Sequence, residues 1–297
     1  MSMLRSDAPR MIVCLALTAG LIRAQAPEAA KIEFDVASVK LSESNVLPSS
    51  SNFPLGPGSA YVPNGGNFSA ARFPLATYVA FAYEIMGSQQ ESLMSQLPRW
   101  AITDKFDIQA RTDGSPAKDA KDQMRLMMRS LLADRFKLAL HFETRQGPAF
   151  GLLALKPGQT GPLLRPHPND SSCSSAPAPN QPGGQFPAVC GGLSPMPSSA
   201  PGLVRFGARN VTMEFIANML TSMGALDQPI LDQTGLAGTF DFALEWVFQP
   251  PGTNLQTDLP GPLFMDAVRE QLGLKLESRR GPVEVLVLDH VERPSQN

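Results

Sequence analysis

The feature that most constrains this chain is a phrase that occurs twice. Residues 143–148 read ETRQGP, and residues 277–282 read ESRRGP, 134 positions further along. Around them, seven of fourteen aligned positions are identical: Arg135/Arg269, Leu138/Leu272, Leu140/Leu274, Glu143/Glu277, Arg145/Arg279, Gly147/Gly281 and Pro148/Pro282. Self-similarity at a constant offset indicates an internal duplication, with two hairpins that are similar by coincidence as the alternative.

The similarity continues upstream of the phrase. Phe106-Asp107 aligns with Phe240-Asp241 at the same offset, and Ala71-Arg72 aligns with Ala208-Arg209 at an offset of 137. Apolar periodicities then predict the same order of elements in each copy, namely β-α-β-α-β-β. We therefore expect an α+β fold of two tandem repeats, with helices packed on antiparallel sheets and an additional N-terminal strand.

Within each predicted repeat, the Gly-Pro pair is interpreted as the turn of a closing hairpin. Glycine supplies the backbone freedom that a turn needs, and proline begins the outgoing strand at a position that need not donate a hydrogen bond. The 28 Pro and 24 Gly cluster between the periodic segments and mark linkers. The predicted organisation is a signal peptide (1–26), an N-terminal strand and loop (27–66), repeat 1 (67–157), a Pro/Gly/Ser-rich linker (158–201), repeat 2 (202–293) and a tail (294–297).

The N-terminus predicts export. Arg5 and Arg10 precede an apolar run of about twelve residues, 11–22, which is too short to span a bilayer but suits the core of a signal peptide. Ala24 and Ala26 then supply small residues for cleavage. A short buried helix and a retained membrane anchor are the alternatives. We expect a periplasmic or secreted protein with no stable membrane insertion after cleavage.

The net charge and the number of cysteines limit which partners and metal sites we expect. The formal net charge of -2 offers no concentrated basic face, so nucleic acid is not expected as a partner. Cys14 lies in the signal, which leaves Cys173 and Cys190 as an even pair in an oxidising compartment. We predict that they form a disulfide in the linker, worth about 3 kcal/mol in the chain-entropy model. Two cysteines do not complete a tetrahedral metal site, so no metal is expected.

The polar residues that attract most interest are Asp107 and Asp241, because aspartate is disfavoured in strands. Arg145 and Arg279 occupy equivalent positions in the predicted hairpins, and the four residues form a candidate polar cluster. The favoured interpretation is a local hydrogen-bonded pair that stabilises each repeat. The alternative is an active site of paired carboxylates between the repeats. HExxH, GxSxG and phosphate-binding motifs are absent from the sequence, so no catalytic, cofactor-binding or metal-binding residue is predicted.

Several phrases together resemble one family. They are FDVASVK (34–40), LPRW (97–100), KFDIQA (105–110), LLADRF (131–136), DQTGL (232–236) and FDF (240–242). In this combination the chain is similar to the soil-associated DUF3738 family of exported proteins, which are numerous in Acidobacteria. The resemblance implies export, and related domains can be fused to membrane metallopeptidases. It implies no activity, so no catalytic residue is carried over.

The sequence therefore predicts an exported, non-enzymatic binding or interaction protein of the cell envelope or extracellular space. Its partner would be an envelope or extracellular protein or ligand, and its sheet edges could accept an added strand. One alternative is a hydrolase of unrecognised type, with Asp107 or Asp241 in a site between the repeats. A second alternative, suggested by the fusions, is an envelope sensor domain.

Overall fold

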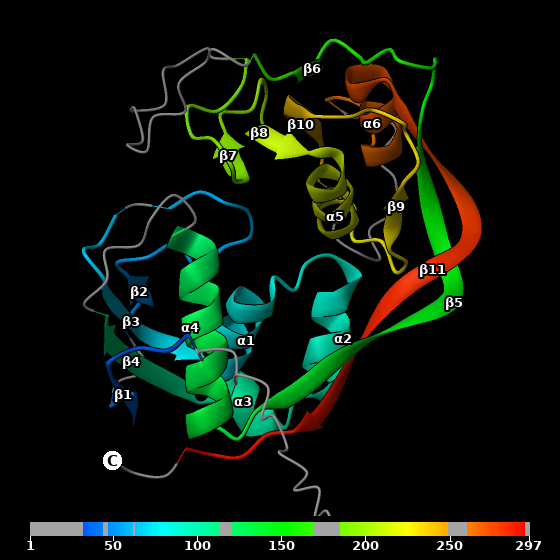
Figure 1. The fold of residues 1–297 in the computed structure, drawn as a ribbon. Helices are drawn as coiled ribbons and strands as arrows, with labels where there is room; N and C mark the ends of the chain where they lie inside the picture. Colours follow the sequence, from blue (N-terminus) through cyan, green and yellow to red (C-terminus); the bar gives the residue numbers. More distant parts are fainter. Residues whose placement is uncertain are drawn as a thin grey trace, which may run out of the picture. The chain divides into compact units, whose positions relative to one another are not determined.

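Six helices and eleven strands make up the described part of the chain (Figure 1). The structure is a computed structural model that describes residues 32–43, 47–61, 63–112, 120–168, 185–248 and 260–294, all within one unit, Ile32–Asn297. The predicted signal peptide lies outside these residues. The strands form three antiparallel or mixed sheets that carry the helices, which confirms the predicted α+β class.

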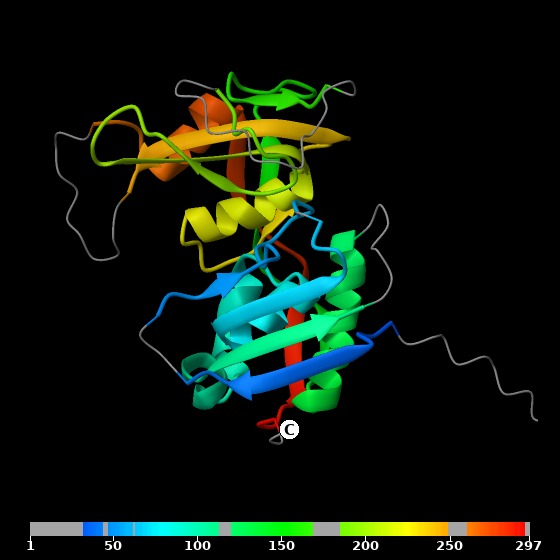
Figure 2. The same cartoon turned by 90° about the vertical axis from the view of Figure 1, so that its left-hand side faces the viewer.

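Lobe 1 is a four-stranded sheet in the order β1-β4-β3-β2 with helices on one face. Figure 2 shows the strands in front and α1 and α4 behind them. The predicted N-terminal strand is present as β1, whereas α2 and α3 were not predicted. The elements are β1 (Val36–Leu41), β2 (Ser50–Ser51), β3 (Asn67–Pro74), α1 (Leu75–Tyr83), α2 (Ser88–Gln96), α3 (Arg99–Thr103), β4 (Lys105–Arg111) and α4 (Ala120–Arg135).

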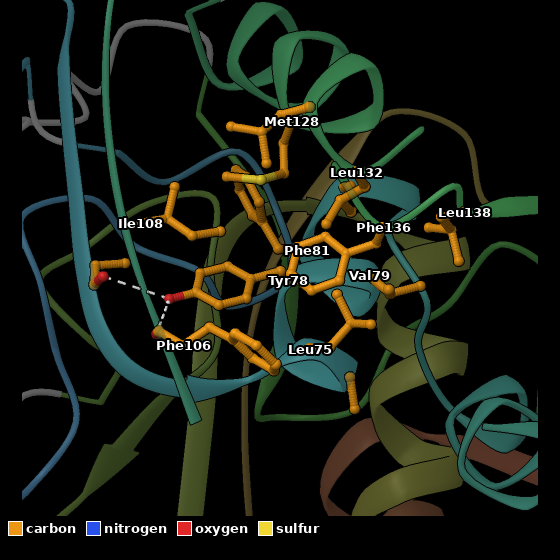
Figure 3. Packing of buried hydrophobic residues seen from close by; sticks show 14 of the residues in the cluster. Leu75, Tyr78, Val79, Phe81, Phe106, Ile108, Met128, Leu132, Phe136 and Leu138 are labelled. Atoms are coloured by element: carbon orange, nitrogen blue, oxygen red, sulfur yellow. Dashed lines mark hydrogen bonds between the residues drawn. The ribbon is translucent and has the colours of Figure 1, made fainter. Parts of the chain in front are cut away.

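Tyr78 stands at the centre of the lobe 1 core and is fully buried (Figure 3). Its ring packs among apolar side chains from α1, β4 and α4, and its hydroxyl donates to the Phe106 carbonyl oxygen at 2.9 Å. Burial and the nearby Asp107 carboxylate both raise the pKa of Tyr78, so the hydroxyl stays protonated and able to donate. The polar tip of this core residue is thereby satisfied.

Lobe 2 repeats the same sheet order with its own strands, β6-β10-β8-β7. Two short edge strands, β6 and β7, lie inside the segment 158–201 that was predicted as a linker. The elements are β6 (Leu164–Pro166), β7 (Ser194–Met196), β8 (Leu203–Thr212), α5 (Met213–Met223), β9 (Ile230–Asp232), β10 (Thr239–Val247) and α6 (Phe264–Leu272).

A side-chain cap sets the start of helix α5. Thr212 is its N-cap, and the Thr212 hydroxyl accepts a hydrogen bond from the Phe215 backbone N–H at 3.2 Å. Met213, Ile216 and Leu220 lie on the buried face of the helix, at the spacing of an amphipathic helix. The cap fixes where the helix starts, and the apolar spacing fixes which face packs on the sheet.

The third sheet shows that the predicted closing hairpins are wrong. Instead of turning at Gly-Pro, each segment runs on as one long strand, β5 (Ala139–Ala154) or β11 (Leu274–His290). The two strands pair antiparallel along their whole length, and Gly147 pairs with Gly281 near the middle. We call this pair of strands the ribbon. The short strand β9 pairs parallel with β5 and completes the sheet.

The prolines fit the ribbon because of where their nitrogens point. The Phe150 N–H donates outward to the Pro229 carbonyl, away from β11, so every second residue of β5 counted from Phe150 faces the outer edge. Pro148 is one of these residues, and its missing N–H leaves no gap in the ladder between the strands. The expectation that this proline need not donate therefore holds, although the turn itself does not form.

The ribbon exchanges its halves between the lobes. Leu286 of β11 is 1% exposed and belongs to the core of lobe 1, although it follows lobe 2 in sequence. Leu152 of β5 is buried in the core of lobe 2, although it follows lobe 1. The second half of β11 therefore completes the core of lobe 1, and the second half of β5 completes the core of lobe 2.

Candidate functional site

Asp107 serves a local role in lobe 1. One oxygen of its carboxylate accepts hydrogen bonds from the Ser42 hydroxyl at 2.5 Å and from the Arg72 backbone N–H at 2.8 Å. Arg72 has a positive φ of 63° and lies in a β-bulge of β3 opposite Asp107. A bulge turns a backbone N–H out of the ladder, and Asp107 provides the acceptor that this group needs.

Asp241 does the same in lobe 2 and is more deeply buried. Its Oδ1 accepts from the Asn210 backbone N–H at 3.0 Å and from His167 Nδ1 at 2.6 Å. Asn210 has a φ of 54° and lies in the bulge of β8. Arg209 Nε lies 3.5 Å from Oδ2 and adds a favourable charge. The two aspartates therefore stabilise two equivalent bulges.

The arginines of the predicted cluster lie elsewhere, on the ribbon. Arg145 binds Glu143 two residues earlier on β5, and Arg279 binds Glu277 in the same way on β11. The pKa of Glu143 is lowered mainly by Arg145 and to a smaller extent by His141. The pKa of Glu277 is lowered mainly by Lys275 and to a smaller extent by Arg279. The structure thus places Asp107, Asp241 and the two arginines on three different sheets.

This placement bears on the hydrolase alternative. A paired-carboxylate site needs two carboxylates close enough to act on one substrate. Asp107 and Asp241 instead belong to different sheets, and each accepts hydrogen bonds from bulge and edge residues of its own lobe. In addition, the described residues contain no group of three or more His, Cys, Asp or Glu that could hold a metal ion.

A cavity lined by residues of both lobes and the ribbon lies away from these aspartates. Its volume is about 850 Å³. Lobe 1 contributes the turn after α1 and the start of α2, lobe 2 contributes α5 and β9, and the ribbon contributes its central part. The lining residues are Tyr83, Glu84, Met86, Ser88, Gln89, Phe142, Thr212, Glu214, Phe215, Asn218, residues 229–233 and residues 282–284.

The polar lining of this inter-lobe cavity has one sign of charge. Four carboxylates line it, those of Glu84, which pairs with Arg125, and of Glu214, Asp232 and Glu284, and its described lining contains no Lys, Arg or His. Clefts lined by one sign of charge concentrate ligands of the opposite sign. The rings of Tyr83, Phe142 and Phe215 add apolar and π surface to the same walls, a surface that can hold both an apolar group and a cation.

Two of these residues are positioned by helix α4. The Arg129 guanidinium lies 4.8 Å from the centre of the Tyr83 ring, and the Arg125 Nη2 binds Glu84 at 2.7 Å. Burial raises the pKa of Tyr83 in spite of Arg129, so Tyr83 presents a neutral ring and hydroxyl. Glu84 has a φ of 53° at the end of α1, which turns the chain toward α2.

Sequence reasoning missed this cavity because its walls come from segments that are far apart in the chain. One local signal was available. Gly87 lies directly before α2 and has a positive φ of 56°, a conformation that glycine adopts readily where the chain turns. The predicted disulfide stays a prediction, because Cys173 lies outside the described residues and the structure describes Cys190 alone.

A comparison with family models identifies the chain. Residues 76–291 match the model described as a protein of unknown function, DUF3738. The chain belongs to this family. The match begins in α1 and covers the rest of lobe 1, lobe 2 and the whole ribbon, whereas β1, β2 and β3 lie outside it. The resemblance to this family noted in the sequence is confirmed.

Other comparisons add no relative. Neither the curated proteins nor the solved structures gave a match to this chain. In the part of the chain that the structure describes, no helix has both the length and the apolar character that a membrane crossing requires.

Proposed function

We propose that this chain is an exported, non-enzymatic binding protein in which two copies of a duplicated unit form the walls of one ligand cavity. The observation that carries the proposal is the inter-lobe cavity, whose volume of about 850 Å³ falls in the range of known ligand sites, roughly 300–1,000 Å³. The ligand would come from the cell envelope or the extracellular space.

Three features support the duplication. The two lobes share one sheet order, and each has an aspartate opposite a β-bulge. Gly147 and Gly281, which the sequence aligns at an offset of 134, are also partners in the ribbon. An ancestral dimer of one repeat would pair each residue of this kind with its own copy, as symmetric homodimers do. Fusing the two copies would then enclose the cavity within a single chain.

The lining chemistry favours a cationic ligand with an apolar part. Carboxylates attract an ammonium group, and the faces of Tyr83, Phe142 and Phe215 can hold both a cation and an adjacent ring. The described lining offers no basic side chain to hold an anion. A binding function also needs no nucleophile or metal, in agreement with the structural roles of Asp107 and Asp241.

Calorimetric titration with two probes of similar shape and opposite charge tests this proposal. We expect 2-phenylethylamine to bind and 3-phenylpropionate not to bind. Glu214→Gln and Glu284→Gln should each weaken amine binding, whereas Glu292→Gln, outside the cavity, should leave it unchanged. If the amine binds no better than the carboxylate, or if the cavity variants bind it as well as the wild type, the proposed site is wrong.

Export has a separate test. Expression of the full chain from its own start codon, followed by cell fractionation and N-terminal sequencing, should give a mature protein that begins near Ala24 to Ala26. A full-length protein retained in the cytoplasm would contradict the export prediction without affecting the proposed cavity.

A further inference from the structure

Lobe 1 holds a second cavity, of about 430 Å³, that differs in chemistry from the inter-lobe cavity. It lies among α1, α2, α3 and residues 55–57. Most of its lining side chains are apolar. They include Leu55, Ala80, Phe81, Ile85, Leu93 and Ile102.

The charges at this lobe 1 cavity cancel each other. Glu84 and Arg125 are the charged residues among its described lining, and they pair at 2.7 Å. The Arg125 guanidinium also donates to the Gly58 carbonyl oxygen at 2.8 Å and lies 6.0 Å from the centre of the Phe81 ring. A charged ligand would have to compete with this pair, whereas an uncharged one would not.

One wall of the cavity is a loop that buried cations hold in place. Lys121 Nζ donates to the carbonyl oxygens of Gly56 at 2.9 Å and Ala60 at 3.0 Å, and Arg125 holds Gly58 between them. Both cations are 4% exposed. Burial lowers the pKa of Lys121 to about 8, with Arg125 as a second cause. The loop carbonyls solvate these cations, so the wall cannot move inward to close the cavity without leaving a buried charge unsatisfied.

The corresponding helix in lobe 2 shows how the two cavities differ. Helices α1 and α5 each begin directly after the third strand of their sheet, at Leu75 and Met213. The second and sixth residues of α1 are Ala76 and Ala80, which line the lobe 1 cavity. The residues at the same places in α5 are Glu214 and Asn218, which line the inter-lobe cavity. The same helix face is thus apolar in one lobe and polar in the other.

We propose that the lobe 1 cavity is a binding site for one small, uncharged, apolar molecule. Its volume lies within the range of small-molecule sites, roughly 300–1,000 Å³. Water in an apolar pocket has few hydrogen-bonding partners, so an apolar molecule that replaces it gains free energy by leaving bulk water. This site does not depend on the inter-lobe cavity, although Glu84 contributes to the walls of both.

The test uses the uncharged fluorophore N-phenyl-1-naphthylamine. We expect a saturable rise in fluorescence with one site per chain. Ala80→Leu places a larger side chain in the lobe 1 cavity and should weaken binding by about tenfold or more. The matched control is Asn218→Leu, the same helix position in lobe 2, which should bind the fluorophore like the wild type.

Folding is checked by thermal melting, because Ala80→Leu fills space and should not lower the melting temperature. Met94→Asp provides a second variant, since Met94 lines the cavity and is exposed enough to accept a charge without disturbing the core. The proposal is overturned if the wild type shows no saturable binding. It is also overturned if both folded variants bind as well as the wild type, or if only Asn218→Leu reduces binding.

Discussion

The two lobes have the same sheet order but protect the ribbon in different ways. Between its first helix and its central strand, lobe 1 has α2 and α3, whereas lobe 2 has β9. From α2, the Gln96 side-chain amide donates to the Leu286 carbonyl oxygen at 2.8 Å and accepts from the Leu288 N–H at 2.9 Å, on the edge of β11. In lobe 2, β9 covers the edge of β5 with backbone hydrogen bonds.

This difference separates what the fold requires from what can vary. An exposed strand edge presents unpaired donors and acceptors and invites association with other chains. Both lobes therefore cover the outer edge of the ribbon segment that completes them. Lobe 1 uses the Gln96 side-chain amide and lobe 2 uses a strand, so the two covers occupy equivalent places and differ in chemistry.

The largest expected effect tests the exchange of ribbon halves. Leu286→Ala should destabilise the protein by about 2–5 kcal/mol, as for other buried leucines. Hydrogen exchange should then show the loss of protection first in α1 and α4 of lobe 1. Leu152→Ala should cost a similar amount and act first on α5 and α6 of lobe 2. Protection lost first in the lobe adjacent in sequence would contradict the exchange.

The second prediction compares the aspartates of the two bulges. Asp241→Ala removes the acceptor for Asn210 and His167 in a buried site, and we expect a loss of about 3 kcal/mol, the upper range for bonds to a charged group. Asp107→Ala acts at a half-buried site and should cost about 1.5 kcal/mol. Urea denaturation measures both losses.

The control for this pair is Asn at each position, because its Oδ1 can still accept from the bulge N–H. Asp241→Asn should therefore lose less stability than Asp241→Ala. Equal losses for Asn and Ala would show that the charge of the carboxylate matters and the hydrogen bond to the bulge does not.

Much of each lobe could be predicted from the sequence, because its strands and helices follow local rules. Period-two alternation around the Phe-Asp pairs 106–107 and 240–241 is the local pattern of β4 and β10, and Thr212 is a residue type that caps a helix such as α5. The sequence SQQESLMSQ of α2 is mostly polar and has a weak apolar stripe, so that helix went unpredicted.

The ribbon was mispredicted because Gly-Pro is equally compatible with a turn and with a strand that has an open edge. The apolar positions gave a signal in favour of the strand. Leu140, Phe142, Phe150 and Leu152 all keep the same even spacing on both sides of Gly-Pro, as one uninterrupted pleat requires. The pairing partner of that strand lies 134 residues away, and local patterns do not specify partners at that separation.

The third prediction concerns the cover over β11. Gln96→Ala removes two hydrogen bonds to the strand edge and should cost about 1 kcal/mol. It should also increase self-association at high concentration, measured by light scattering, since the edge is then open. Gln89→Ala, earlier in the same helix, is the control and should change neither quantity. If Gln96→Ala changes neither stability nor self-association, then other residues of α2 protect this edge and the prediction for Gln96 is wrong.

The smallest expected effect distinguishes the two ends of the ribbon by pH. His141 hydrogen-bonds to Asp289 and then to Glu143, and both raise the pKa of His141 above its ordinary value. Protonated His141 therefore stabilises the folded state fully at pH values below its ordinary pKa of about 6.5. This stabilisation is lost as pH rises through the higher pKa of His141 in the folded state.

The aligned residue at the other end of the ribbon is Lys275, which binds Glu277. Lysine side chains keep their charge throughout this range of pH. The stability difference between wild type and His141→Gln should therefore shrink from pH 5.5 to pH 8.5, whereas the difference for Lys275→Gln should stay constant. Urea denaturation at the two pH values measures both stability differences. A constant difference for His141→Gln would contradict the predicted protonation effect of His141.

The exchange of ribbon halves also fixes the order in which the protein can be finished as it is synthesised. Leu286 belongs to the core of lobe 1 and is synthesised after all of lobe 2. The N-terminal half cannot close its core while the ribosome is still adding residues to the C-terminal half. The core of lobe 1 therefore stays incomplete until β11 has been synthesised. The nascent chain stays open for longer than a chain of two independent domains would.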